Sequence, residues 1–149
     1  MIKFISLFLL SFLSFGKTAE LIFTPEFIFE KVLERKQIVT IPEKKIPEIF
    51  YASKTELKQF QDDIEPQWGI RPEVITNAYV VAKNRIYIMD DLEYYESTKR
   101  CMDDSLAHEL THFVQVVYQG WDINEESLEW DAVDIQTWFR TEHCKIIRD

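Results

Sequence analysis

Two amphipathic stretches near the C-terminus constrain the fold of this chain more than any other sequence feature. Each carries apolar residues at the i, i+4, i+7 and i+11 spacing of one helical face. The two stripes are Leu106, Leu110, Phe113 and Val117, followed by Leu128, Ala132, Ile135 and Phe139. Gly120 is suited to end the first helix, and Asp122 to cap a second helix whose first turn would hold Glu125 and Glu126. The pattern predicts an antiparallel helix pair.

The chain between residues 46 and 100 predicts strands and one further helix. Alternation and β-propensity favour strands over 46–52, 74–82 and 85–89, with a turn at Lys83-Asn84. Apolar spacing predicts a helix over 53–64, ended by Pro66 and Gly69. Residues 90–100 are acidic and polar, and no element is predicted there. Together with the helix pair, these segments predict an α+β domain with a small sheet of three or more strands.

The N-terminal part is divided into three predicted segments. Residues 1–16 are typical of a secretory signal peptide, with a positive Lys3, an apolar run over 4–15 and small residues before a cut after Gly16; a cut after Ala19 is the alternative. The apolar run is shorter than the roughly 20 residues of a membrane span, so no stable span is expected after cleavage. Residues 17–45 are expected to form a helix over about 25–35, with Phe27, Val32 and Leu33 inward, and a connector; residues 46–149 form the main domain. The protein is therefore predicted to be exported, to the periplasm or outside the cell.

Composition excludes some classes of function. The formal net charge is −9, from 17 Lys and Arg against 26 Asp and Glu, which argues against nucleic acid as a partner. The chain has three Gly, too few for a Gly-rich phosphate loop. Aromatic residues make up 14%, which is enough to build a core and argues against a disordered chain.

The motif most indicative of chemistry is His108-Glu109-Leu110-Thr111-His112, an HExxH on the first helix of the predicted pair. Histidines at i and i+4 share one helical face and can bind one Zn²⁺ through nitrogen. Glu109 is then placed to act as general base on a metal-bound water. Two of only three histidines in the chain fall in this motif. The sequence therefore predicts a zinc site with Glu109 as the catalytic residue.

The third zinc ligand is predicted from the geometry of the helix pair. If the pair turns near Gly120-Trp121, residues equally far from that turn face each other. His112 and Glu129 are equally far from it, so Glu129 is the expected ligand, with Glu125 as the alternative.

The two cysteines, Cys101 and Cys144, also lie at similar distances from this turn, one before the first helix and one near the end of the second. In an oxidising compartment they are expected to form a disulfide that clamps the helix pair. Two free thiols are the alternative.

The segments Ala107–Gln115 and Glu129–Gln136 together resemble the zincin superfamily of zinc metallopeptidases, in its gluzincin-like branch. They are most similar to small exported bacterial domains of unknown function with HELxHxxQ and a later ExxAxxxQ. The resemblance covers about residues 46–140 and implies a minimal zincin-like domain. It also implies His108, His112 and Glu129 as ligands, Glu109 as general base, and an edge strand within 74–89 that pairs with an extended peptide substrate.

The chain departs from the family pattern in two places. Many gluzincins have Asp four residues after the ligand glutamate, where this chain has Val133; Asp131 or Asp134 is expected to orient a histidine instead. The oxyanion-stabilising residue of larger gluzincins has no clear counterpart, and His143 and Tyr118 are the candidates. Gln115 and Gln136 lie on the same helical faces as His108 and Glu129, and are expected either to hydrogen-bond across the pair or to be solvated.

Three functions are compatible with these features. The first is an exported zinc peptidase acting on peptide or protein substrates. The second is a catalytically silent zincin-fold protein that binds or supports a partner and still holds zinc. The third is an exported acidic domain without metal, such as an inhibitor or adaptor. No oligomeric state is predicted.

Overall fold

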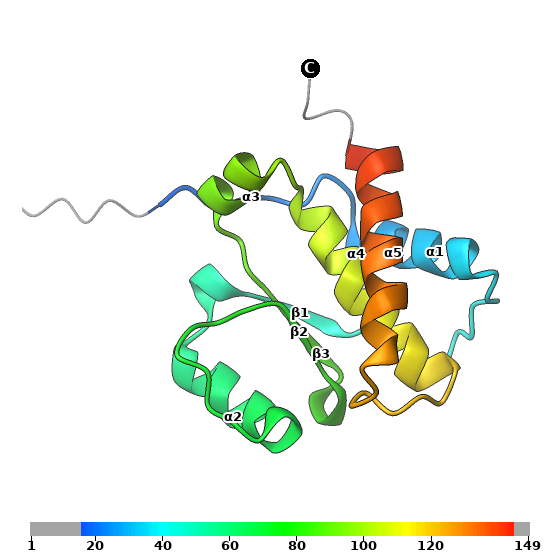
Figure 1. Cartoon of the computed structure of the whole chain (residues 1–149), viewed down its shortest axis with the longest axis horizontal. Coiled ribbons are helices and arrows are strands. Elements are labelled where there is room, and N and C mark those ends of the chain that lie inside the picture. Colours follow the sequence, from blue (N-terminus) through cyan, green and yellow to red (C-terminus); the bar gives the residue numbers. More distant parts are fainter. Residues whose placement is uncertain (1–15, 145–149) are drawn as a thin grey trace, which may run out of the picture.

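A computed structural model describes residues 16–144 and confirms the α+β class (Figure 1). The predicted signal peptide, apart from Gly16, lies outside the described residues. Among the residues described, no helix is long and apolar enough to cross a membrane. In chain order, the helices and strands are α1 (Pro25–Lys36), β1 (Glu48–Tyr51), α2 (Leu57–Trp68), β2 (Ala78–Val80), β3 (Arg85–Ile88), α3 (Leu92–Thr98), α4 (Met102–Phe113) and α5 (Ser127–His143).

The strands between residues 16 and 144 form one mixed sheet in the order β1-β3-β2, with β1 parallel and β2 antiparallel to β3. Side chains alternate between its two faces, as the strand pleat requires. Tyr79, Ile86 and Ile88 join the core formed with α1, α4 and α5. Ala78, Val80 and Tyr87 pack instead against Phe60 and Ile64 of α2. The sheet therefore lies between α2 and the other helices (Figure 1).

The predicted helix pair is present as α4 and α5, which lie side by side (Figure 1). Both apolar stripes face the core, although Val117 is only half-buried. After Phe113 the helix continues as a π-helical turn over Val114–Tyr118, and Gly120 follows with a φ of 72°. The predicted start of the second helix is wrong, because Asp122 accepts a hydrogen bond from the N–H of Asn124 in a local turn and α5 begins at Ser127. Glu125 and Glu126 consequently precede the helix.

Helix α1 matches its prediction closely. Thr24 caps it by accepting a hydrogen bond from the N–H of Phe27, and Pro25 occupies its first position. Val32 and Leu33 are buried as predicted, whereas Phe27 is half-buried and stacks on Phe23. The buried side of α1 belongs to the same core as α4 and α5.

Other elements also differ from prediction, and β1 and β3 are shorter than the predicted ranges 46–52 and 85–89. Helix α2 starts later and continues through Pro66 to Trp68, because a proline in the last turn removes only the bond to the Asp62 carbonyl, and Gly69 then ends the helix with a φ of 71°. The strand predicted over 74–82 is reduced to β2, because the Asn77 side chain, at 2.7 Å, accepts the bond from Met89 N–H. Helix α3 was not predicted; Asp91 caps it and Tyr95 is its buried residue.

The predicted disulfide between Cys101 and Cys144 is formed, with the two Cα atoms 6.3 Å apart. It joins the residue before α4 to the residue after α5 across a sequence separation of 43. In the chain-entropy model a loop of this size stabilises the fold by about 4 kcal/mol. The helix pair is therefore clamped at the end remote from its connecting loop.

Candidate metal centre

Helices α4 and α5 bring the three predicted ligands together. His108 and His112 stand one turn apart on α4, with their Nε2 atoms 3.1 Å apart. Glu129, in the first turn of α5, places Oε2 3.4 Å from His108 Nε2 and Oε1 3.1 Å from His112 Nε2. These three side chains form a group whose ligand atoms could hold one metal ion. The alternative ligand, Glu125, lies in the loop before α5 and does not belong to the group.

The outer nitrogen of His112 is held by a glutamine. His112 Nδ1 lies 2.9 Å from Gln115 Oε1. The amide nitrogen of Gln115 donates both its hydrogens elsewhere, to the Leu128 carbonyl at 3.0 Å and to Asp131 Oδ2 at 2.9 Å. The amide oxygen of Gln115 must therefore face the histidine, so Nδ1 carries the proton and Nε2 is left with a free lone pair.

The outer nitrogen of His108 is held in the same way from α5. His108 Nδ1 lies 3.1 Å from Gln136 Oε1, and Gln136 Nε2 donates to Asp104 Oδ1 at 2.9 Å. His108 therefore also has its proton on Nδ1. Burial, and then the neighbouring His112, lower the pKa of His108, which keeps the imidazole neutral and available as a ligand.

The site consequently points two nitrogen lone pairs and one carboxylate at the same small volume. With both histidines neutral and protonated on Nδ1, none of these three groups donates a hydrogen bond to another, and a cation between them would satisfy all three. Ligand atoms about 2.0–2.1 Å from a tetrahedral zinc ion stand roughly 3.3 Å apart. The observed separations of 3.1–3.4 Å match that spacing. The donor set of two histidines and one glutamate thus fits zinc.

Glu109 lies beside these ligands and is almost completely buried, at 6% exposure. It accepts a hydrogen bond from the backbone N–H of Tyr79 in β2. Burial, and then the charge of Glu129, raise the pKa of Glu109 to about 8. This value belongs to the site without a metal ion; a cation bound beside Glu109 would favour the ionised form, which is the form a general base requires.

A cavity of about 220 Å³ opens over the three ligands and Glu109. Its other walls come from α2, the segment leading into β2, and the loop before α5. They are contributed by Gln67, Trp68, Asn77, Ala78, Tyr79, Ile123 and Asn124. The ligand group is therefore open to solvent through this cavity, and β2, an edge strand, lines it.

The edge of β2 that faces away from β3 is already occupied by a side chain. Gln67 Nε2 donates to the Tyr79 carbonyl at 2.9 Å, and Gln67 Oε1 accepts from Val81 N–H at 3.0 Å. The amide thus bonds to β2 in the way a neighbouring strand would. A peptide that pairs with β2 along Tyr79–Val81 would have to displace it.

Several residues predicted to take part lie elsewhere. His143, at the end of α5, packs among Phe23, Phe27 and Phe139, and Tyr118 packs against Phe29 and Phe113. Neither lines the cavity, so neither is placed to stabilise an oxyanion. Of the two aspartates expected to orient a histidine, Asp131 supports His112 indirectly, through Gln115, whereas Asp134 is exposed.

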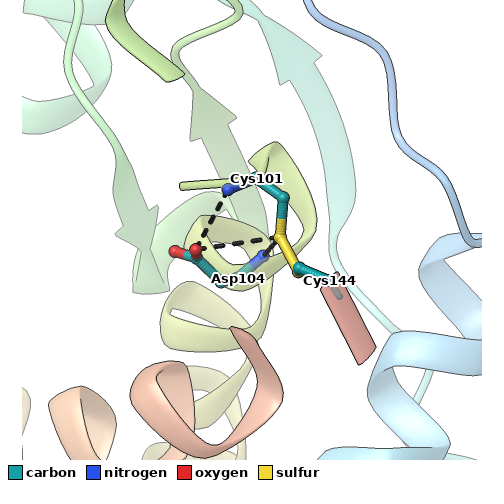
Figure 2. Close-up of side chains that lie close together, drawn as sticks. All are labelled: Cys101, Asp104 and Cys144. Carbon is teal, nitrogen blue, oxygen red and sulfur yellow. Dashed lines mark hydrogen bonds between the residues drawn. A yellow bond between two sulfur atoms is a disulfide. The ribbon is translucent and has the colours of Figure 1, made fainter. Parts of the chain in front are cut away.

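A second group of possible ligands consists of Cys101, Asp104 and Cys144, all buried (Figure 2). Sulfur binds metals as thiolate, and both sulfurs here are joined in the disulfide. This group is therefore no metal site in the oxidised protein.

Sequence reasoning missed the functional contacts of Asp104, Gln67 and Tyr79. Asp104 lies four residues before His108, hence on the same face of α4, and that spacing was a usable signal. The contact between Gln67 and the edge of β2 had no local signal, because it joins two elements through side-chain geometry.

Comparisons with protein-family models, with curated proteins and with solved structures returned no match. The functional interpretation therefore depends on the site itself.

Proposed function

We propose that the protein is an exported zinc-dependent peptidase of the zincin type. His108, His112 and Glu129 would hold the zinc, and Glu109 would act as general base. The observation that carries the proposal is the convergence of three acceptor groups on one point beside a buried glutamate, under an open cavity. The disulfide supports export, because such bonds persist in oxidising compartments.

Bound zinc would supply Lewis acidity and a water of lowered pKa. The protein's own contribution is positional. Gln115 and Gln136 hold both imidazoles with Nε2 toward the metal, and the antiparallel packing of α5 brings Glu129 to the same point. Glu109, held by Tyr79 N–H, would take a proton from water and return it to the leaving amine.

The test combines metal analysis with a peptide-library screen of the residues 17–149 chain, disulfide intact. We expect about one zinc per wild-type chain, one in Glu109→Gln, and strongly reduced zinc in Glu129→Ala. Cleavage should be zinc-dependent in the wild type and abolished in Glu109→Gln. Full activity in Glu109→Gln would refute its role as base. An unchanged zinc content in Glu129→Ala would show that Glu129 is not the third ligand. A Glu125→Ala variant would then test whether Glu125 is.

A second candidate is a zinc-holding protein without peptidase turnover. The observation that favours it is the Gln67 amide, which covers the strand edge that an extended peptide would need. In this case the wild type would bind zinc but cleave nothing in the library. Gln67→Ala would then show whether the Gln67 amide prevents cleavage by occupying the edge of β2. Gln61→Ala is the control, because Gln61 contacts the Pro72 carbonyl and does not line the cavity.

A further inference from the structure

The disulfide lies at the outer end of a chain of hydrogen bonds that begins at a zinc ligand. Cys101 is the N-cap of α4, and Asp104 is the third residue of that helix. Cys101 N–H donates to Asp104 Oδ2 at 3.2 Å, and Asp104 N–H donates to Cys101 Sγ at 3.3 Å (Figure 2). This reciprocal capping box holds the carboxylate of Asp104 directly beside the disulfide.

Asp104 is fully buried, and its other oxygen is bonded to a glutamine that contacts His108. Oδ1 accepts from Gln136 Nε2 at 2.9 Å and from Arg100 Nη2 at 3.3 Å. An ionised carboxylate accepts hydrogen bonds and cannot donate them, so it permits one orientation of the Gln136 amide. That orientation turns Oε1 toward His108 Nδ1. The charge of Asp104 therefore determines which nitrogen of His108 carries the proton.

The disulfide also fixes the distance between the two helices that this series of hydrogen bonds connects. Asp104 belongs to α4 and Gln136 to α5, and Cys101–Cys144 ties the start of α4 to the end of α5. The cross-link thus keeps the donor on one helix opposite the acceptor on the other. Without it, these helix ends are held only by packing and by the hydrogen bond between Gln136 and Asp104.

We propose that Asp104 is a positioning residue for the zinc ligand His108, and that the Cys101–Cys144 disulfide sets the zinc affinity of the site through Asp104 and Gln136. The oxidised protein then binds zinc more tightly than the protein without the disulfide, although no cysteine touches the metal. This inference concerns the metal site of the proposed function, but it requires no turnover.

The first measurement is zinc affinity by competition with a chromophoric chelator. The variants are Cys101→Ser/Cys144→Ser, Asp104→Asn and the combination of all three. Serine keeps an acceptor at the N-cap, so the double serine variant removes the cross-link and retains the cap. We expect each variant to bind zinc at least about tenfold more weakly than the wild type. The zinc affinity of the combined variant should fall by much less than the product of the two separate losses, because both changes act through the same series of hydrogen bonds. Fully additive losses, or affinities within about threefold of wild type, would overturn the proposal.

The second measurement is the tautomer of His108 in the metal-free protein, from long-range proton–nitrogen NMR correlations. We expect the Nδ1-protonated form in the wild type and a substantial Nε2-protonated fraction in Asp104→Asn, since an asparagine lets the Gln136 amide turn over. A general loss of stability would not change the tautomer, and the disulfide of this variant remains intact to keep it folded. An unchanged tautomer would overturn the role of Asp104 even in a protein that binds no zinc, so the outcome is independent of the peptidase proposal.

Discussion

His108 and His112 each place Nδ1 against a glutamine oxygen, and each glutamine donates to an aspartate, but the two aspartates have different surroundings. Asp104, behind His108, is fully buried beside the disulfide. Asp131, behind His112, has a side chain 41% exposed and forms an ion pair with Lys36 of α1. The same arrangement thus ends at a disulfide in the core on one side and at a partly buried ion pair on the other.

This difference indicates where the site can tolerate change. Removing a hydrogen-bond donor from a buried carboxylate destabilises the folded protein, because water cannot replace the donor. An exposed carboxylate that loses a partner is solvated instead. We name the two arms after their aspartates: Gln136 and Asp104 are the buried arm, and Gln115 and Asp131 are the exposed arm, although both glutamines are buried. We expect the buried arm to be the more sensitive.

The largest effect is expected from Gln136→Leu in the buried arm. The change removes the acceptor for His108 Nδ1 and leaves Asp104 without its closest side-chain donor. We expect zinc affinity to fall 10- to 100-fold and the free energy of unfolding to fall by about 1–3 kcal/mol. Chelator competition and urea unfolding measure the two quantities.

The matched control is Gln115→Leu in the exposed arm, where Asp131 remains in contact with Lys36 and water. It should weaken zinc binding with a smaller loss of stability than Gln136→Leu. A larger loss of stability in Gln115→Leu would contradict the comparison.

Glu109 lies beside the ligands and belongs to neither arm. Its contribution to the free energy of unfolding should depend on pH. In the metal-free protein its pKa is raised from the usual 4.5 to about 8 by burial and then by Glu129. The ionised form is therefore disfavoured in the folded state, and this penalty is absent below pH 4.5 and grows as the pH rises toward 8. We expect chelator-treated Glu109→Gln to be more stable than the wild type by on the order of 2 kcal/mol at pH 7, with little difference at pH 4.5.

Urea unfolding at several pH values between 4.5 and 8 would measure that difference. A variant in the exposed arm, Asp131→Asn, provides the control, because a carboxylate on the surface carries no comparable burial penalty. A stability difference for Glu109→Gln that does not change with pH would show that Glu109 is not buried as an acid.

The parts of the molecule that the sequence predicted are those governed by local periodicity. Two stripes of apolar residues determine α4 and α5, and an antiparallel pair with a short loop then places Glu129 opposite His112 by geometry alone. The cysteines follow from the same geometry. These features needed no knowledge of side-chain contacts, which is why the ligand group could be predicted residue by residue.

The features that the sequence did not predict depend on contacts between distant elements. Asp103 and Asp104 lie in the first turn of α4, where acidic residues are usually solvated, but both are fully buried. Asp103 accepts hydrogen bonds from the N–H groups of Ile22 and Phe23, about eighty positions earlier. The seven residues of α3 are too few to show a periodic stripe. Charge burial and short helices are therefore beyond what local patterns can predict.

The smallest effect is expected from the outer end of the exposed arm. Lys36→Ala removes the ion pair with Asp131, whose carboxylate then remains solvated and still accepts from Gln115. We expect zinc affinity to change by less than about threefold and the free energy of unfolding by less than about 1 kcal/mol. A tenfold loss of zinc affinity in Lys36→Ala, measured beside Asp104→Asn, would mean that the ion pair of α1 supports His112 as strongly as the buried arm supports His108, and that burial is not what separates the two arms.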